Sequence, residues 1–315
     1  MNKTVLAHFA LFSLNMLYGA NHLLAKGVMP DYLGPNAFIF LRALITTLLF
    51  VVIFSFFIRE KVARKDLPLL AVTGFFGVAV NQLFFFNGLE LTSPINVGII
   101  MTSTPILVVI LSYFIRKEKI TPLKAVGVIV GAAGAIALTT LGKKPGFDSP
   151  LGDLYIFINA LSFGIYLVIA KPLMDKYKPI TVVTYNFMFG FLIILCYPMV
   201  WTDLSVVDFT DFPSSIWLKI SYVVFGATFF TYLLNIFALK HVSPSVSGSY
   251  IYTQPMLVMV FTVLFAYFGW TEDFVGAITL EKIAYMLMIF LGVFLISRSS
   301  YLQRKRKAQG KDIPN

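Results

Sequence analysis

The chain has 315 residues, of which 58% are hydrophobic and 13% are charged, with a formal net charge of +10 and a mean hydropathy of +0.83. A water-soluble domain cannot cover its surface with so few charged side chains, so most of the chain is expected to contact lipid. The basic residues fall between apolar segments rather than on one face, which disfavours nucleic acid as a partner. The single cysteine, Cys196, excludes an internal disulfide and a cysteine metal site.

Ten segments are apolar over the roughly 20 residues that a helix needs to cross the hydrocarbon core of a bilayer. Helices are expected because lipid offers the backbone no hydrogen-bond partners. The connections are short, and no soluble domain is expected between them. In chain order the predicted spans are Thr4–Ala25, Asn36–Ile58, Leu67–Asn87, Ile95–Ile115, Leu123–Leu141, Leu151–Ala170, Ile180–Trp201, Ile216–Leu239, Ser245–Phe268 and Ile278–Ser297.

The lysine and arginine residues outside the spans are distributed unequally between the two sides of the predicted membrane. Nineteen fall on the side that carries both termini, and four, Lys26, Lys143, Lys144 and Lys282, fall on the other. Loops rich in lysine and arginine stay in the cytoplasm. Both termini are therefore predicted to be cytoplasmic, in a bacterial inner membrane.

One short motif occurs twice. Ser93-Pro94-Ile95-Asn96-Val97-Gly98, followed by Pro105, recurs 150 positions later as Ser243-Pro244-Ser245-Val246-Ser247-Gly248, followed by Pro255. Apolar residues match each other by chance, but two prolines, a glycine and a serine at one offset indicate an internal duplication.

The duplication divides the ten spans into two halves of five. An odd number of spans per half gives the halves opposite orientations in the membrane, which is typical of alternating-access carriers. We therefore predict a first five-helix repeat over residues 1–145, a second, inverted repeat over 146–298 and a basic cytoplasmic tail over 299–315. The predicted fold class is an all-α integral membrane protein whose two inverted repeats surround a central cavity. A duplicated structural bundle is the alternative.

The chain resembles a known family at these motifs. Tyr18-Gly19-Ala20-Asn21 at the end of the first span, together with the Ser-Pro…Gly…Pro element of the fourth and ninth spans, is similar to the EamA family of the drug/metabolite transporter superfamily. The resemblance covers about residues 6–297. It implies a carrier of small metabolites, commonly amino acids or related compounds, that often works as an exporter. It also implies a cavity lined mainly by spans one, three, four, six, eight and nine. Tyr18 stands where family members typically carry tryptophan, a departure that alters the cavity wall.

Polar side chains inside the spans are expected to face the interior of the bundle or a water-filled cavity, because they are costly in lipid. In spans one, six and eight they recur at helical spacing on one face, and in span eight the set includes Thr228 and Thr231. The candidate cavity residues are Asn15, Tyr18, His22, Arg42, Asn81, Gln82, Phe85, Thr102, Asn159, Ser162, Tyr166, Tyr232, Asn235, Tyr250 and Gln254. The alternative for each polar residue is a hydrogen bond between packed helices.

Two of these candidates carry specific hypotheses. Arg42 lies well inside span two, where it either binds a substrate carboxylate through two parallel hydrogen bonds or extends to headgroups and loop carbonyls. Its counterpart in the second repeat is Asn186, so the repeat does not require the charge. His22 is either a proton carrier, because its pKa lies near neutrality, or a packing histidine.

The prolines of the repeated motif have two interpretations. Pro94 and Pro244 stand where a helix begins, and proline is well tolerated in that first turn. Pro105 and Pro255 lie inside spans four and nine, where proline removes a backbone hydrogen bond and bends the helix. These two are predicted hinges, with a freed carbonyl near the middle of the membrane.

The sequence thus predicts an alternating-access transporter, an exporter or facilitator, of small neutral or zwitterionic metabolites, with amino acids as the best guess. The alternatives are a proton-coupled multidrug or nucleoside/purine exporter and, less favoured, a non-transporting membrane protein or an intramembrane enzyme. No Asp or Glu lies deep in a span, which disfavours proton-coupled export of cationic drugs. No cofactor or metal is expected, because the three histidines lie at different depths. The expected partners are a small-molecule substrate and the lipid bilayer, and ten spans suffice for a pathway in a monomer.

Overall fold

A computed structural model describes residues 3–117, 120–239, 241 and 250–308, and over these residues the chain is helical, without a β-strand. The α-helices are α1 (Lys3–Lys26), α2 (Pro35–Ile53), α3 (Leu67–Gly74), α4 (Asn81–Leu91), α5 (Pro94–Met101), α6 (Thr104–Arg116), α7 (Pro122–Thr140), α8 (Pro150–Lys176), α9 (Pro179–Leu195), α10 (Pro198–Ser205), α11 (Ser214–Ser221), α12 (Thr231–Leu239), α14 (Gln254–Tyr267) and α15 (Leu280–Ala308). Three π-helical segments, η1 (Phe54–Ile58), η3 (Phe75–Val80) and η5 (Tyr222–Phe230), continue α2, α3 and α11. The short 3₁₀ helices are η2 (Arg64–Asp66), η4 (Phe209–Asp211), η6 (Tyr250–Thr253) and η7 (Val275–Ala277).

Eight helical segments in the described part of the chain are long and apolar enough to cross a membrane, and nine if the bent pair α9–α10 counts as one. The helix α1, although 24 residues long, is not among them. The helical, membrane-spanning character predicted from the sequence is therefore confirmed, whereas ten spans in two inverted repeats remain a prediction. The repeated motif at Ser243–Gly248 lies outside the described residues.

Proline and hydroxyl side chains mark the starts of the helices. Proline occupies the first turn of nine of them, where its missing N–H removes no helical hydrogen bond. Ser93, Thr121 and Ser149 cap α5, α7 and α8, accepting hydrogen bonds from the backbone N–H groups of Asn96, Lys124 and Gly152. The local sequence thus determines where these helices begin.

Two predicted spans are interrupted. The seventh, predicted as one helix over Ile180–Trp201, ends as α9 at Leu195, and α10 leaves at 70° with Pro198 in its first turn. The fourth is interrupted at Thr102 and Ser103, between α5 and α6, and Pro105 lies in the first turn of α6. Pro255 likewise lies in the first turn of α14, after η6. The prolines stand at interruptions of the helices, and whether these positions move remains a prediction.

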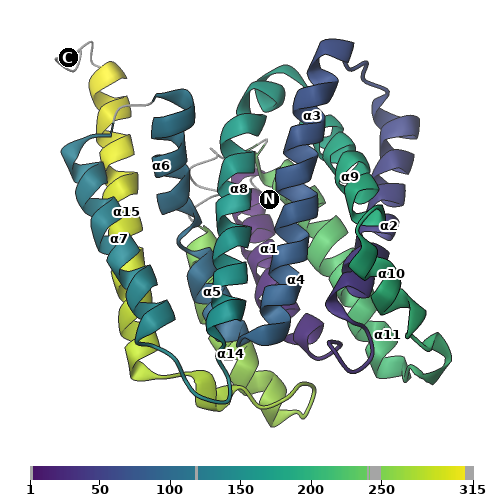
Figure 1. Ribbon diagram of the computed structural model, residues 1–315. Helices are drawn as coiled ribbons and strands as arrows, with labels where there is room; N and C mark the ends of the chain where they lie inside the picture. The colour runs from purple at the N-terminus through teal and green to yellow at the C-terminus, as the bar shows by residue number, and fades with distance from the viewer. Residues whose placement is uncertain (1–2, 118–119, 240, 242–249, 309–315) are drawn as a thin grey trace.

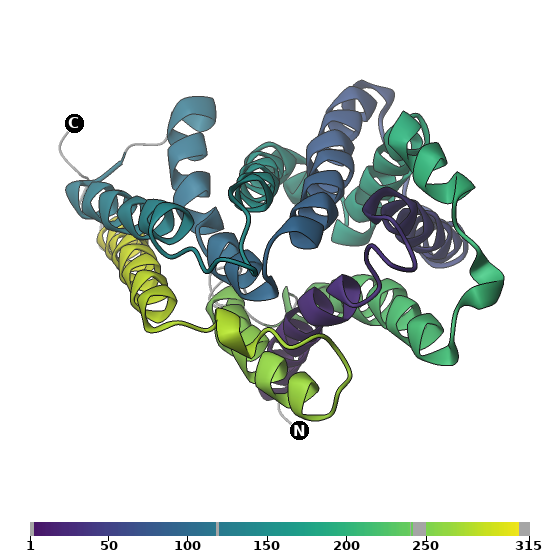
Figure 2. The same cartoon turned by 60° about the horizontal axis from the view of Figure 1, so that its bottom comes forward.

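The helices run roughly side by side, with α7 and α15 packed together at one edge of the molecule and α2 and α9 at the other (Figure 1). Figure 2, turned by 60°, shows the same separation. Glycines allow the close approach of α7 and α15, because a Cβ atom on Gly292 would lie 2.6 Å from the carbonyl oxygen of Gly127 and from the Cα atom of Gly131. Between the two edges, the largest fully buried aromatic side chains are Phe38, Phe50, Phe86 and Phe187.

Candidate substrate cavity

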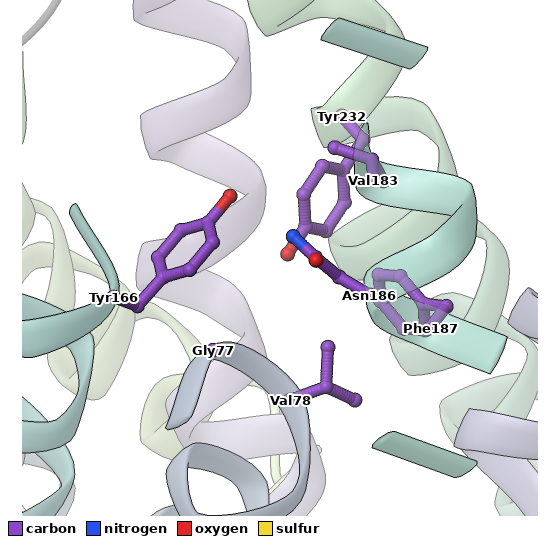
Figure 3. Close-up of a pocket in the computed structure, with 7 residues that line it drawn as sticks. All are labelled: Gly77, Val78, Tyr166, Val183, Asn186, Phe187 and Tyr232. Carbon is purple, nitrogen blue, oxygen red and sulfur yellow. The ribbon is translucent and has the colours of Figure 1, made fainter. Parts of the chain in front are cut away.

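A small cavity of about 170 Å³ lies among η3, α8, α9 and α12 (Figure 3). Two predicted residues, Tyr166 of α8 and Tyr232 of α12, enter it from opposite sides, beside the amide of Asn186. The full lining is Gly77, Val78, Tyr166, Val183, Asn186, Phe187 and Tyr232. Tyr166 lies within hydrogen-bonding reach of Asn186, and Asn186 Oδ1 accepts a hydrogen bond of 2.7 Å from Thr73 Oγ1. The cavity therefore combines phenol and amide groups with an apolar wall.

Glycine makes room for one of the phenols. A Cβ atom at Gly77 of η3 would lie 2.6 Å from ring carbon Cδ2 of Tyr166 and 2.8 Å from Cγ. These distances are much shorter than a van der Waals contact, so only glycine lets the Tyr166 ring lie flat against η3. The position of one cavity wall thus depends on a residue that the sequence analysis did not select.

Arg42 of α2 lies next to these phenols. Its Nε donates a hydrogen bond of 2.6 Å to Thr228 Oγ1, and its Cζ atom lies 5.1 Å from the centroid of the Phe86 ring. Tyr232 and Tyr18 are close enough to interact electrostatically with the guanidinium group. All three side chains are half-buried, as is Tyr166, so water reaches part of each although helices surround them. Arg42 therefore contributes one positive charge to an aromatic, hydroxyl-rich interior.

A second group of predicted residues bonds helices to one another. Asn159 Nδ2 of α8 donates to the Asn81 carbonyl oxygen at 2.7 Å, and Asn81 Nδ2 lies 3.4 Å from the Asn159 carbonyl oxygen. Ser162 Oγ donates to the Phe76 carbonyl oxygen at 2.6 Å. Asn159 and Ser162 are buried, whereas Asn81 is half-buried. In this structure Asn159 and Ser162 make the cross-helix bonds that were the alternative to a cavity role.

The predicted residues at the start of the chain join α1 to α14. Gln254 Nε2 donates to Asn15 Oδ1 at 3.0 Å, Asn15 Nδ2 donates to the Leu11 carbonyl oxygen at 2.8 Å, and both side chains are buried. The Tyr250 hydroxyl lies 2.8 Å from His8 Nδ1. Asn235 of α12 is half-buried. These residues lie in a different part of the bundle contacts from the Tyr166–Tyr232 cavity.

Hydroxyl groups cover the carbonyls at the interruption between α5 and α6. Thr102, Ser103 and Thr104 donate side-chain hydrogen bonds of 2.6, 2.7 and 2.8 Å to the carbonyl oxygens of Ile99, Ile100 and Met101. Thr253, before Pro255, donates in the same way to the Tyr250 carbonyl oxygen at 2.6 Å. The carbonyls expected to be freed here for a ligand are therefore occupied. Thr102, which is fully buried, covers a carbonyl in this structure.

Several buried polar atoms between α1 and α4 have no partner in the described structure. They are Asn21 Oδ1, His22 Nδ1 and Gln82 Oε1. The His22 ring packs 5.6 Å from the ring of Phe85, which is half-buried. Buried polar groups without partners are costly, so these positions mark space for water or a ligand group.

The sequence analysis missed a polar network at the end of the bundle where α4 ends and α8 begins. Lys282 Nζ and Asp148 Oδ2 form an ion pair of 2.5 Å with no exposure of either side chain, and Ser93 Oγ donates to Asp148 Oδ1. Asp153, in the first turn of α8, is also buried and accepts hydrogen bonds from Thr92 Oγ1 and Asn96 Nδ2. The charges looked like solvated loop residues because nothing local in the sequence brings them together.

Lys26 also differs from the expectation of an interface anchor. Its Nζ donates to the carbonyl oxygens of Leu89, Glu90 and Thr92 at 2.8, 2.6 and 3.0 Å. The last carbonyls of a helix lack helical partners, so a lysine from a neighbouring helix binds them well. Lys26 thus fastens the end of α1 to the end of α4.

The chemistry that this interior offers is binding by hydrogen bonds, aromatic faces and one guanidinium. The described residues contain no group of three or more His, Cys, Asp or Glu side chains that could hold a metal ion. The arrangement is suited to holding a small polar molecule.

Comparisons with known proteins agree on a transporter. The EamA-like transporter family matches the chain twice, over residues 5–140 and 150–298. A relative named "Uncharacterized transporter" from Archaeoglobus fulgidus is 26% identical over 85% of this chain and 90% of its own length. "Uncharacterized transporter YyaM" from Bacillus subtilis is 24% identical over 80% of this chain and 84% of its own. "Protein WALLS ARE THIN 1" from Arabidopsis thaliana is 25% identical over 60% of this chain and 59% of its own. One crystal structure shares the fold, with a TM-score of 0.58 at 17% identity, over 93% of this chain and 96% of that one.

Proposed function

Because the chain belongs to the EamA-like transporter family and is an integral membrane protein, we propose that it is an alternating-access carrier, an exporter or facilitator, of small neutral or zwitterionic metabolites, best represented by amino acids. The observation that carries the proposal is the interior around Tyr18, Arg42, Tyr166, Asn186 and Tyr232. It is polar, partly open to water and enclosed by helices from both parts of the chain that the family matches. Such an interior suits a solute of amino-acid size.

The two-repeat arrangement is part of this proposal. The family matches each half separately, and π-helical segments occur in both halves, as η3 and η5. A carboxylate also caps the start of α2 and of α9: Asp203 Oδ2 accepts from the backbone N–H of Asn36, and Glu60 Oε2 accepts from that of Lys178. These correspondences support two inverted five-helix repeats, with α1 as the first of ten spans. Both termini would then be cytoplasmic in the inner membrane, with a monomer as the working unit.

We further propose that the halves rock about the central cavity, with the interruptions at Pro105 and Pro255 as hinges. Proline prevents either interruption from closing into a regular helix. The hydroxyl groups of Thr102, Ser103, Thr104 and Thr253 keep the nearby carbonyls satisfied. A segment whose carbonyls already have partners can change its bend without exposing unpaired groups to lipid.

The competing function is proton-coupled export of cationic drugs. Arg42 disfavours it, because a positive charge inside the cavity repels a cationic solute. A neutral nucleoside or purine is compatible with the aromatic and amide groups, and it remains the second candidate substrate class.

The test is flux into liposomes that contain the purified protein, across a panel of twenty amino acids, nucleosides and cationic dyes, with and without a pH gradient. Amino-acid flux that needs no gradient is the expected result. Dye efflux driven by the pH gradient would support the competing function instead. Absence of flux for every compound, from protein that remains folded, would contradict the proposal that the chain is a carrier of such solutes.

A further inference from the structure

The guanidinium group of Arg42 is held by one edge only. Thr228 has a single hydroxyl hydrogen, and Thr228 Oγ1 also lies 2.8 Å from the carbonyl oxygen of Val223, five residues earlier in the π-helical segment η5. Since a carbonyl can only accept, that hydrogen is directed to Val223, and Oγ1 accepts the Nε–H of Arg42 at 2.6 Å. The bond leaves both terminal nitrogens, with four N–H groups, without a hydrogen-bond acceptor among the described residues.

The positive charge also lacks an anionic partner in the described structure. The ion pairs between described residues are Lys176–Asp66 and Lys282–Asp148, and neither includes Arg42. The contacts of the guanidinium are the hydroxyl of Thr228 and the face of Phe86. An aromatic face stabilises a cation modestly, and a charge enclosed by protein without a counter-ion is costly. The cavity thus has a fixed cation whose counter-charge must come from elsewhere.

We infer that the counter-charge is the carboxylate of the transported molecule, bound through the two terminal nitrogens of Arg42. A planar carboxylate matches the fork of a guanidinium with two parallel hydrogen bonds. The inference rests on the proposed function and narrows it: the substrate is a small organic carboxylate, an amino acid or a simple acid, and neither a neutral nucleoside nor a cationic dye.

A phosphate ester fits this site less well than a carboxylate. It carries nearly two negative charges at neutral pH, and Arg42 supplies one positive charge. The position that corresponds to Arg42 in the second half is Asn186, which is neutral and bonded to Thr73. A singly charged carboxylate balances the cavity, whereas a phosphate monoester would leave a buried negative charge.

Thr228 acquires a defined role in this arrangement. By accepting the Nε–H it fixes the plane of the guanidinium, so it is a positioning residue that acts through Arg42. Its π-helical bond to Val223 keeps the hydroxyl oxygen turned toward Arg42. Loss of this hydroxyl should weaken binding of carboxylates while leaving the positive charge in place.

The first test measures binding directly, by the ligand-induced rise in melting temperature of the purified protein in detergent. The probes are L-leucine and L-phenylalanine, their uncharged-carboxyl analogues L-leucinamide and L-phenylalaninamide, and uridine and ethidium. We expect at least one amino acid to bind wild-type protein and its amide to bind about 10- to 100-fold more weakly, the range for losing a charge-assisted hydrogen-bond pair. Arg42→Gln should abolish the preference, and Arg42→Lys, which keeps the charge without the fork, should retain part of it.

The matched control is Arg59→Gln, which removes an exposed arginine from the other end of the same predicted span. It should bind the probes as wild type does. Equal binding of an acid and its amide, unchanged binding in Arg42→Gln, or no binding of either amino acid to folded wild-type protein would overturn the inference.

The second test separates Thr228 from a general structural effect. Thr228→Val should raise the KM for the bound amino acid in liposomes about 5- to 10-fold with little change in kcat, the loss expected for one hydrogen bond to a charged group. Thr262→Val is its control, because Thr262 is equally buried and its hydroxyl bonds only the carbonyl of Val258. An equal change in both variants would contradict the positioning role. Carboxylate-selective binding without any flux would instead refute the transport function and leave the carboxylate site standing.

Discussion

Substitution of Gly77 by alanine tests whether the cavity wall at Tyr166 is as tightly built as the structure indicates. The added Cβ atom would lie 2.6, 2.8 and 3.1 Å from ring carbons Cδ2, Cγ and Cε2 of Tyr166. All three are near the attached end of the ring, so the side chain cannot avoid the contact by moving its tip. Either η3 and α8 must separate or Tyr166 must leave its position beside Asn186.

Overpacking of this kind costs about 1–3 kcal/mol. For a chain of this size we expect a fall in melting temperature of roughly 2–4 °C per kcal/mol, by analogy with soluble domains. Because Tyr166 lines the cavity, flux in liposomes should fall as well, and by more than the fraction of unfolded protein explains.

The chain offers a matched control in the other π-helical segment. A Cβ atom at Gly226 of η5 would meet the Tyr222 ring at 3.4 Å and beyond, an ordinary contact. Gly226→Ala should therefore leave stability unchanged or raise it slightly, since alanine favours helix over glycine. Tyr166→Ala combined with Gly77→Ala should cost less than the two single changes added together. Equal effects of Gly77→Ala and Gly226→Ala, or strict additivity with Tyr166→Ala, would refute the steric argument.

Three further outcomes follow from the packing. Lys282→Met should destabilise the protein by about 3–5 kcal/mol, because it leaves the Asp148 carboxylate buried without its cation; Lys176→Met, at the more exposed pair with Asp66, should change the melting temperature little. Gly292→Ala should lower the melting temperature through contact with Gly127 and Gly131, whereas Gly269→Ser, which has open space around it, should show only the strain of its positive φ. Pro105→Ala combined with Pro255→Ala should slow flux in liposomes without loss of folded protein, and a wild-type rate in this double variant would count against the hinges.

The sequence predicted the helices well because their signals are local. The first span was expected at Thr4–Ala25 and α1 occupies Lys3–Lys26, and the fifth was expected at Leu123–Leu141 where α7 occupies Pro122–Thr140. Apolar length, capping hydroxyls and first-turn prolines all lie within or beside the helix that they define. The 70° break between α9 and α10 was missed because the segment from Leu195 to Trp201 is apolar, although Pro198 was a usable signal.

The site was only partly predictable, because spacing on one helix does not tell what faces it. Tyr166 and Ser162 lie one turn apart on α8, yet Tyr166 lines the cavity and Ser162 bonds the carbonyl of Phe76. The Asp148–Lys282 pair joins residues 134 positions apart, and no local pattern indicates it. Gly77 carries no polar group at all, and its importance appears only when Tyr166 is packed against it.

Arg42 and Asn186 together suggest how the charge of the cavity arose on a repeated framework. Arg42 of α2 bonds Thr228 in the second half, and Asn186 of α9, 144 residues later, accepts from Thr73 in the first half. Each side chain reaches across to a threonine of the opposite half, so the two contacts correspond although only one is charged. The framework evidently accommodates asparagine at this place, so Arg42→Asn should fold as well as the wild type. If the carboxylate inference is right, such a protein keeps its cavity and loses its preference for acids, which means that charge selectivity and the transport fold are separable properties of the chain.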